Sequence, residues 1–241
     1  MWEHTDYEKG LRLRKPVLIV SISTSILQYR TLYSQGRELA DYMLRKMRFD
    51  LVGSTYSSSL PPEVITRDDG TVSLPACRMY RNKGDRDLLL LAGDSSPLDD
   101  QYQFAHRILA LAAEVGVEEL YSVGARWTDA PLQPADNPDL WGFATDMEGV
   151  AELKKQGVKI MSNEPAPFFA SLVVGLCGSH GIRGFKVSVN HGEPAPHPLS
   201  VRSILGVLSA MIGFEIDRGD LGAKTTIPPA SPGADLSSIY H

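Results

Sequence analysis

The sequence predicts an α/β fold, in which β-strands and α-helices alternate along the chain. Residues 16–23, PVLIVSIS, form a continuous β-branched and aliphatic run, which is typical of a strand covered on both faces by helices. Residues 86–94, RDLLLLAGD, repeat this pattern, and helical spacing of apolar residues follows both runs. In a chain of 241 residues, 43% hydrophobic and 22% charged content is typical of a globular domain.

The first half of the chain is expected to contain two helices and several strands. Residues 31–47 place apolar side chains at helical spacing, with Arg and Lys near the end, where they complement the helix dipole. A second strand is expected at 49–55, FDLVGST. Near residues 60–82 the sequence DDG stands between two β-rich stretches, which predicts a β-hairpin excursion. A helix at 100–116 ends at a glycine, and a strand at 118–125 follows it.

The second half is expected to continue the alternation after one long interruption. Residues 126–142, RWTDAPLQPADNPDLWG, show no periodicity, and connections of this length tend to be functional or interfacial. The elements expected after it are a short strand in LWGFATD, a helix at 147–157, a strand at 158–164, a helix at 165–181 with proline in its first turn, a strand at 184–193 and a helix at 198–216.

The end of the chain differs in composition from the rest. Periodicity stops near Arg218, and residues 222–238 have the Pro, Gly and Ser content of a linker. We therefore expect a single α/β domain at 14–217 and a flexible C-terminal tail at 218–241. The printed chain finishes on Ile239, Tyr240 and His241, an apolar ending that a spacer does not need.

Charge and cysteine content bear on the partners and location. The formal net charge is −5, which argues against nucleic acid or an anionic membrane as the main partner. The two cysteines, Cys77 and Cys177, lie far apart in apolar surroundings, which favours reduced thiols over a disulfide framework. The sequence shows no basic start followed by an apolar segment and no run of about 18 apolar residues. We expect a cytoplasmic protein.

The motifs for common cofactors and metals are absent from the sequence. The turn after the first strand, SISTSILQYR, has no glycine, so it lacks the dinucleotide-binding pattern, and no P-loop is present. His191, Glu193 and His197 are metal-ligating types, but their spacing matches no zinc motif, and the prolines between them favour an extended surface loop. We expect no cofactor and no metal site.

One candidate crevice follows from the expected sheet. Asp94 ends the strand LLLLAGD, and in open α/β sheets the carboxyl ends of strands border the ligand crevice. Arg126, Trp127, Asp129 and Trp141 of the long connection are candidates for its other wall. Asp94 suits a general base, but it is equally a common turn and helix-capping residue. The sequence fixes no nucleophile beside it, so no catalytic residue is assigned.

The order of these elements resembles the proteasome assembly chaperone 2 family, over roughly residues 16–217. The resemblance is carried by PVLIVSIS, LVGSTYSSSLPPEV with its hairpin, RDLLLLAGDSSP, EELYSVGA, LWGFATD and the final helix. The turn STSIL departs from it, because many relatives have glycines there. The resemblance implies a phosphorylase/hydrolase-like three-layer sandwich, with a central, mostly parallel sheet between helices, and homo-oligomers in prokaryotic members. It implies no catalytic residues.

The same resemblance gives the chain ending a role. Proteasome assembly chaperones and regulatory particles commonly end in a hydrophobic residue, tyrosine and any residue, and this motif docks between neighbouring α-subunits of the core. Ile239, Tyr240 and His241 match it position by position. The leading hypothesis is a non-enzymatic homo-oligomer that binds the α-ring of the proteasome core particle, as an assembly chaperone or activator. The alternatives are a hydrolase or ligase that uses the candidate crevice, and an oligomeric scaffold with an incidental tail.

Overall fold

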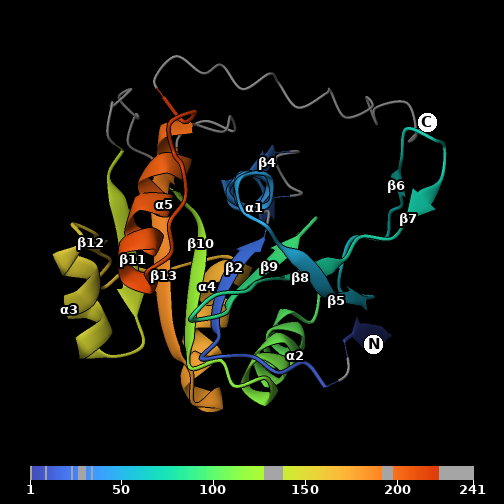
Figure 1. Cartoon of the computed structure of the whole chain (residues 1–241), viewed down its shortest axis with the longest axis horizontal. Helices are drawn as coiled ribbons and strands as arrows, with labels where there is room; N and C mark the ends of the chain where they lie inside the picture. The colour runs from blue at the N-terminus through green and yellow to red at the C-terminus, as the bar shows by residue number, and fades with distance from the viewer. Residues whose placement is uncertain are drawn as a thin grey trace.

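The computed structural model describes residues 2–8, 10–22, 24–26, 31–33, 35–127, 138–191 and 198–222, with the backbone alone at 24–26, 31–33, 35, 127 and 191. Within these residues a mixed sheet of nine strands forms the centre of the molecule (Figure 1). From one edge to the other the strands are β1 (Glu3–Tyr7), β5 (Asp50–Ser57), β8 (Cys77–Asn82), β9 (Leu88–Gly93), β2 (Val17–Ile22), β10 (Glu119–Trp127), β13 (Arg183–His191), β11 (Leu140–Ala144) and β12 (Lys159–Ile160).

The middle of the sheet is parallel and its flanks are largely antiparallel. Strands β9, β2, β10 and β13 run parallel to one another, with Val17 opposite Leu88 on one side and Glu119 on the other. Strands β1, β5, β8 and β9 are antiparallel neighbours, as are β13 and β11, whereas β11 and β12 are parallel. The carboxyl ends of these four central strands therefore lie side by side, at the same end of the sheet.

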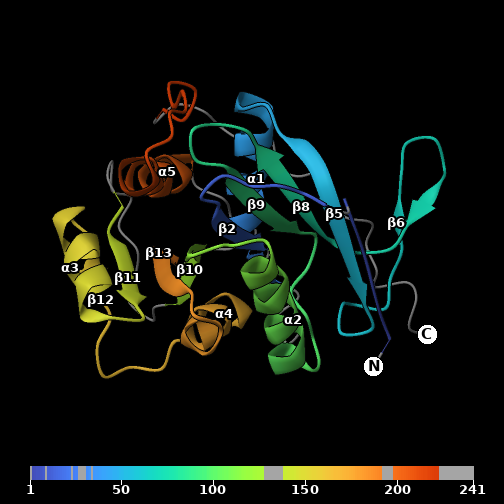
Figure 2. The same cartoon turned by 60° about the horizontal axis from the view of Figure 1, so that its bottom comes forward.

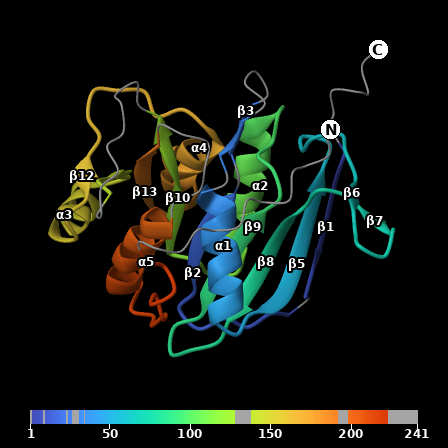
Figure 3. The same cartoon turned by 90° about the horizontal axis from the view of Figure 1, so that it is seen from above.

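Helices cover both faces of the sheet, which confirms the predicted three-layer α/β sandwich. Figure 2 shows α1 (Gln35–Lys46) and α5 (Pro198–Ile212) on one face, and α2 (Gln101–Glu114) and α4 (Phe169–Leu176) on the other. Helix α3 (Met147–Lys155) packs beside β11 and β12. The view from above separates the same layers (Figure 3).

Strand β2 shows why the sequence specifies this architecture. All six of its residues are buried, and successive side chains point to opposite faces. Val17 and Ile19 belong to the core under α1 and α5, whereas Leu18 and Val20 belong to the core under α2 and α4. A continuous apolar run is what a strand between two helical layers requires.

The predicted hairpin excursion is confirmed. Strands β6 (Ile65–Thr66) and β7 (Val72–Ser73) pair antiparallel and project away from the main sheet (Figures 1 and 3). Gly70 supplies the positive φ of +80° that the turn needs. The Asp69 carboxylate accepts hydrogen bonds from the backbone N–H and the hydroxyl of Thr71, at 2.9 and 2.7 Å.

Several predicted helices are shorter in the structure. The helix expected at 31–47 begins at Gln35, because the backbone at Thr31–Tyr33 forms β4, which pairs with β3 (Thr24–Ile26). The helix expected at 165–181 is α4, followed by the 3-10 helix η2 (Cys177–His180). Pro165 and Pro167, which were expected in the first turn of this helix, precede it, because α4 begins only at Phe169. The residue before α4, Phe168, has a positive φ of 80° that is not helical. Helix α5 ends at Ile212, where Gly213 takes a positive φ of 86°.

The ordered elements extend past the expected bounds of 14–217 at both ends. Strand β1 pairs with β5 along its whole length, although its residues precede the expected start. At the other end, Leu221 is buried in the core under α1 and α5. The hydroxyl of Tyr42 donates a 2.8 Å hydrogen bond to the carbonyl of Asp217, and Lys46 pairs with Asp220. These contacts fix the chain as far as the last described residues.

Candidate functional site

The carboxyl ends of the central strands hold two separate groups of predicted site residues. Asp94 directly follows β9, and its Oδ2 atom accepts a 2.7 Å hydrogen bond from Nη1 of Arg78 and a 3.3 Å one from the N–H of Ala76. Nη1 of Arg37 lies 3.5 Å from the other carboxylate oxygen. Both oxygens of Asp94 are therefore engaged by guanidinium groups, and the geometry gives Asp94 a role in joining β8, β9 and α1.

Arg126 and Trp141, which the sequence places in one candidate crevice, do contact each other. The guanidinium carbon of Arg126 lies 4.4 Å from the centroid of the Trp141 ring, within the range of a cation–π interaction. Arg126 also donates from Nη1 to Oδ1 of Asn190 at 3.0 Å and from Nη2 to Oε2 of Glu164 at 2.6 Å. We call Arg126, Trp141, Glu164 and Asn190 the Arg126 cluster.

The Arg126 cluster lies on the face of the sheet that α4 covers. Side chains of paired residues in neighbouring strands point to the same face. The hydroxyl of Ser122 donates to the carbonyl of Ala170 in α4, at 2.7 Å, which identifies the face. The pairs along it, listed from β10 to β13 or from β13 to β11, are Ser122 with Lys186, Gly124 with Ser188, Arg126 with Asn190, Lys186 with Phe143, and Ser188 with Trp141.

Lys186 is the unexpected member of this face. Its side chain is 3% exposed, and its Nζ atom has no hydrogen-bond partner among the described residues. Burial lowers the pKa of the Lys186 amine to about 7, because a charged ammonium group loses its hydration. A Cβ atom at Gly124 would lie 3.0 Å from this Nζ atom, so the glycine provides the space that the amine occupies.

Two more buried donors on the same face have no acceptor among the described residues. They are Nε of Arg126 and Nε1 of Trp141. Buried polar groups in native proteins are nearly always hydrogen-bonded, so a group of exceptions calls for an explanation. Here all three unpaired atoms, with Nζ of Lys186, are hydrogen-bond donors.

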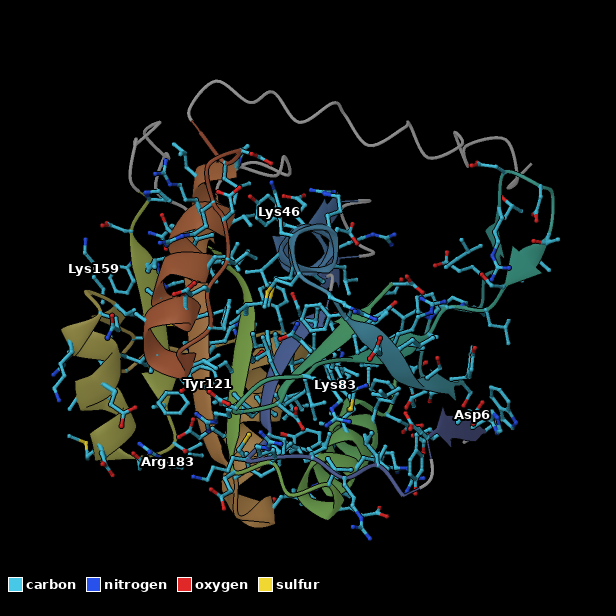
Figure 4. The ribbon with its side chains drawn as sticks, viewed as in Figure 1. Asp6, Lys46, Lys83, Tyr121, Lys159 and Arg183 are labelled. Carbon is cyan, nitrogen blue, oxygen red and sulfur yellow. The ribbon has the colours of Figure 1, made fainter. Side chains whose placement is uncertain are left out.

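The opposite end of the sheet carries a different charged group, which Figure 4 marks by Tyr121 and Arg183. Arg183 lies 3.0 Å from Glu152 and 3.2 Å from Asp146, and these contacts tie α3 to β13. Asp146 also caps α3 by accepting from the N–H of Gly149 at 2.7 Å. Burial, with a nearby Glu119 carboxylate, raises the pKa of the Tyr121 hydroxyl. Here each charge has an opposite partner, as expected of a structural network.

Lys159 flanks the Arg126 cluster from the edge strand β12 (Figure 4). Its Nζ atom lies 5.7 Å from the centroid of the Trp141 ring and 2.6 Å from the carboxylate of Asp139. The Trp141 ring is thus approached by two cations, Arg126 and Lys159. Each cation is paired with a carboxylate, so the charge is balanced within the cluster.

Sequence reasoning found Arg126 and Trp141 but missed Lys186 and Gly124. One signal was available, because Lys186 interrupts an apolar strand, GFKVSV, that the fold class places under helices on both faces. A lysine in such a strand is expected to be buried. Its neighbours were not accessible in the same way, because they depend on the pairing of β13 with β10 and β11.

The remaining predicted residues lie outside the described residues. They are Asp129, the side chain of Trp127, and the terminal residues Ile239, Tyr240 and His241. Among the described residues no group of three or more His, Cys, Asp or Glu side chains is arranged to hold a metal ion. Within the same part of the chain no helix is long and apolar enough to cross a membrane.

A family model described as the PAC2 family matches residues 35–226. The chain belongs to the PAC2 family. The match runs from α1 past the end of α5 and confirms the family resemblance found in the sequence. Among curated proteins, an uncharacterised protein of Methanocaldococcus jannaschii is 21% identical to this PAC2 protein over 125 residues. That alignment covers 51% of this chain and 47% of the relative, so it spans about half of each.

Solved structures with the same fold cover most of this PAC2 chain. Pyrococcus furiosus PbaB, described as an archaeal proteasome activator, superposes with a TM-score of 0.78 and 17% identity, over 91% of this chain and 92% of PbaB. Pyrococcus furiosus PbaA, described as an archaeal homolog of proteasome-assembly chaperone, gives 0.72 and 18%, over 91% and 89%. A proteasome-assembly chaperone homologue of Mycobacterium tuberculosis gives 0.68 and 16%, over 86% and 89%. These likenesses establish a shared fold.

Proposed function

We propose that this PAC2-family protein binds the core particle of a proteasome through Ile239, Tyr240 and the carboxylate of His241. The observation that carries the proposal is the likeness to PbaB, an archaeal proteasome activator, over nearly the whole of both chains. The ending of the printed sequence supports it, because it follows the hydrophobic, tyrosine, any-residue pattern of proteasome-docking tails. We infer a cytoplasmic homo-oligomer that contacts the α-ring, as an assembly chaperone or as an activator.

The three terminal residues have the chemistry that a docking pocket uses. A terminal carboxylate pairs with a pocket lysine, and the tyrosine combines apolar area with one hydroxyl group. Burying Ile239 and Tyr240 contributes roughly 1.5–3 kcal/mol each. Ordering the preceding residues costs about 1–2 kcal/mol apiece, so a single tail binds weakly.

An oligomer compensates for the weakness of one tail. Leu221 packs into the core under α1 and α5, and the residues after it are the ones that we propose reach the ring. A flexible chain of about 20 residues spans roughly 25 Å on average, enough to bridge from a domain to a ring surface. Several tails that reach one ring strengthen binding by about 100-fold or more.

The test is a pull-down of the proteasome core from the same organism, using the full chain as bait. We expect capture by the wild-type chain and loss of capture with Tyr240→Ala, or after extension by one residue that displaces the carboxylate. Tyr102→Ala is the matched control, because Tyr102 is a tyrosine on α2 that is 64% exposed, and it should capture as the wild type does. Equal capture by all four chains would overturn docking through the tail and leave the scaffold hypothesis.

The enzyme hypothesis is less well supported. It needs Asp94 as part of a crevice with Arg126 and Trp141. The contacts of Asp94 are with Arg78 and Arg37, whereas Arg126 contacts Trp141, Glu164 and Asn190. A turnover that Asp94→Ala abolishes, in a variant that still folds, would restore this hypothesis.

A further inference from the structure

Lys186 is the strongest departure from ordinary protein chemistry among the described residues. An amine buried without a hydrogen-bond partner costs free energy whether it is charged or neutral. Lysine is almost never fully buried unless it is paired. Neither α4 nor β11 carries an ionisable side chain, and the only ionisable groups of β10 are Glu119, Tyr121 and Arg126. The elements packed around Lys186 therefore offer it no carboxylate on its own face.

The amine of Lys186 occupies the space above Gly124. Gly124, two residues before Arg126 on the same face, has no side chain, and a Cβ there would approach both Nζ of Lys186 and, at 4.0 Å, Cβ of Ala170. The two serines of this face already donate to carbonyl groups, Ser122 to Ala170 and Ser188 to Trp141, at 2.7 and 3.0 Å. Neither hydroxyl can therefore donate a hydrogen bond to the neutral amine of Lys186.

The unpaired donors of this face come from three adjacent strands. Lys186 lies on β13, Arg126 on β10 and Trp141 on β11, and the last two are in contact. Ser188, the next residue after Lys186 on this face of β13, pairs with Gly124 of β10 on one side and with Trp141 of β11 on the other. A group of donors without acceptors is complementary to a ligand that carries only acceptors, which is an oxyanion.

We propose that Lys186, Arg126 and Trp141 form a binding site for a small oxyanion, a carboxylate or a phosphate, on the α4 face of β10, β13 and β11. The anion accepts hydrogen bonds from Nζ of Lys186, Nε of Arg126 and Nε1 of Trp141. The guanidinium of Arg126 is already paired with the carboxylate of Glu164, at 2.6 Å, so Lys186 supplies the net positive charge of the site. This site does not depend on the chain ending, so it goes beyond proteasome binding.

Proton uptake is a specific consequence of this arrangement. The free amine is largely neutral above its lowered pKa of about 7. A bound anion favours the ammonium form, so the amine takes one proton from the buffer when the anion binds above that pH. Arg126 of β10 shares the face of Lys186, and Glu164, from the segment before α4, pairs with Arg126 at 2.6 Å. Because these two groups are paired with each other, they leave Lys186 as the group that changes charge.

The test is isothermal titration of the full-length protein at pH 8 and constant ionic strength, with inorganic phosphate in one arm and malonate in the other. Each arm uses two buffers of different ionisation enthalpy, which measures the proton uptake. We expect saturable binding of one of the two probes, with uptake of up to one proton. Binding of phosphate alone or malonate alone assigns the chemistry of the site.

Variants separate this site from non-specific binding. We expect Lys186→Met to weaken binding at least tenfold and to abolish proton uptake. Gly124→Ala should also weaken it, because its Cβ crowds the amine while the flexible end of Lys186 can shift to preserve the fold. Lys154→Met, at an exposed position of α3, is the matched control and should bind as the wild type does.

Two results would overturn the proposal. One is the absence of saturable binding of either probe to the wild-type protein. The other is equal affinity and equal proton uptake in the wild type and in Lys186→Met. If Lys186→Met does not fold, Gly124→Ala decides, and unchanged binding in that variant counts against the site.

Discussion

Nη2 of Arg81 donates a 2.7 Å hydrogen bond to Oδ2 of Asp87, a carboxylate with 2% side-chain exposure. The same Oδ2 atom accepts from the N–H of Arg14 at 2.8 Å, and Nη2 of Arg81 also donates to the carbonyl of Arg12 at 3.1 Å. The pair therefore joins the segment that enters β2 to the turn between β8 and β9. This ion pair holds together the residues that directly precede two central parallel strands, β2 and β9.

Removing the charge of Asp87 should destabilise the fold. Asp87→Asn keeps the size of the side chain but leaves the guanidinium of Arg81, which is only 16% exposed, without its counter-charge. We expect a loss of about 3 kcal/mol in the free energy of unfolding, as for other broken buried pairs. Urea denaturation measures it. Asp85→Asn, at an exposed position of the same turn, should change stability by less than about 0.5 kcal/mol.

The Asp87 pair also predicts how stability depends on acid. Burial alone would raise the pKa of the Asp87 carboxyl, but the hydrogen bonds from Arg14 and Arg81 outweigh it and lower the pKa. An aspartate in the unfolded chain titrates near about 3.9. The stabilising contribution is thus complete above about pH 5 and is lost as the pH falls through the lowered value. In Asp87→Asn this part of the pH dependence of the free energy of unfolding should be absent. If the free energy of unfolding falls in the same way below about pH 5 in the wild type and in the variant, the prediction is wrong.

Lys186 predicts a dependence of the same sign as Asp87, but in a neutral to alkaline pH window. Its pKa is about 7 in the folded protein and about 10.4 in the unfolded chain. The unfolded chain therefore binds more protons between these values, and stability rises with pH across that window. Holding this amine in the core costs on the order of 4 kcal/mol at pH 7.

Lys186→Met should accordingly be more stable than the wild type. Methionine has a similar length and no charge, so it fills the same space without the desolvation cost. We expect a gain of a few kcal/mol at pH 7, measured by urea denaturation in a buffer without phosphate or carboxylate, and a smaller gain at pH 10. Lys154→Met should show no such trend. A loss of stability in Lys186→Met at pH 7 would contradict the prediction.

The fold was largely predictable where a strand lies between two helical layers. Strands β2 and β9 are continuous apolar runs because helices cover both of their faces, so their position is visible in the sequence. Strand β1 was missed, since its residues, EHTDY, are polar and alternate between half-buried and exposed at the sheet edge. An edge strand with so little burial has no hydrophobic signal to detect.

The candidate site was predictable only in part, for a related reason. Arg126 and Trp141 stand out because they flank a long aperiodic segment. The environment of Lys186 depends on which strands lie beside β13, and these are β10 and β11, which are separated from it by two helices in the sequence. Periodicity along one strand identifies the face of a side chain, but it does not identify the side chains next to it.

Two glycines differ in how closely other atoms pack around them, so replacing each by alanine should have opposite effects on stability. A Cβ on Gly142 in β11 would overlap the carbonyl oxygen of Lys186, whereas a Cβ on Gly175 in α4 has nothing within 4 Å. Gly142→Ala should cost at least about 2 kcal/mol, because the carbonyl belongs to the ladder between β11 and β13. Gly175→Ala should gain about 0.5–1 kcal/mol from helix propensity. Thermal unfolding measures both, and equal changes would contradict the packing.

The proposed docking tail predicts a difference between an isolated tail and the whole protein. A peptide of residues 223–241 carries the Ile239, Tyr240, His241 ending but only one copy of it. If several tails of the proposed oligomer reach one ring, we expect the full chain to bind the proteasome core about 100-fold more tightly than the peptide does. Surface plasmon resonance on immobilised core particle measures both affinities. The peptide with Tyr240→Ala should not bind, since the aromatic contact supplies much of its affinity. Equal affinities of peptide and full chain would show that multivalency contributes nothing, even if the tail itself docks.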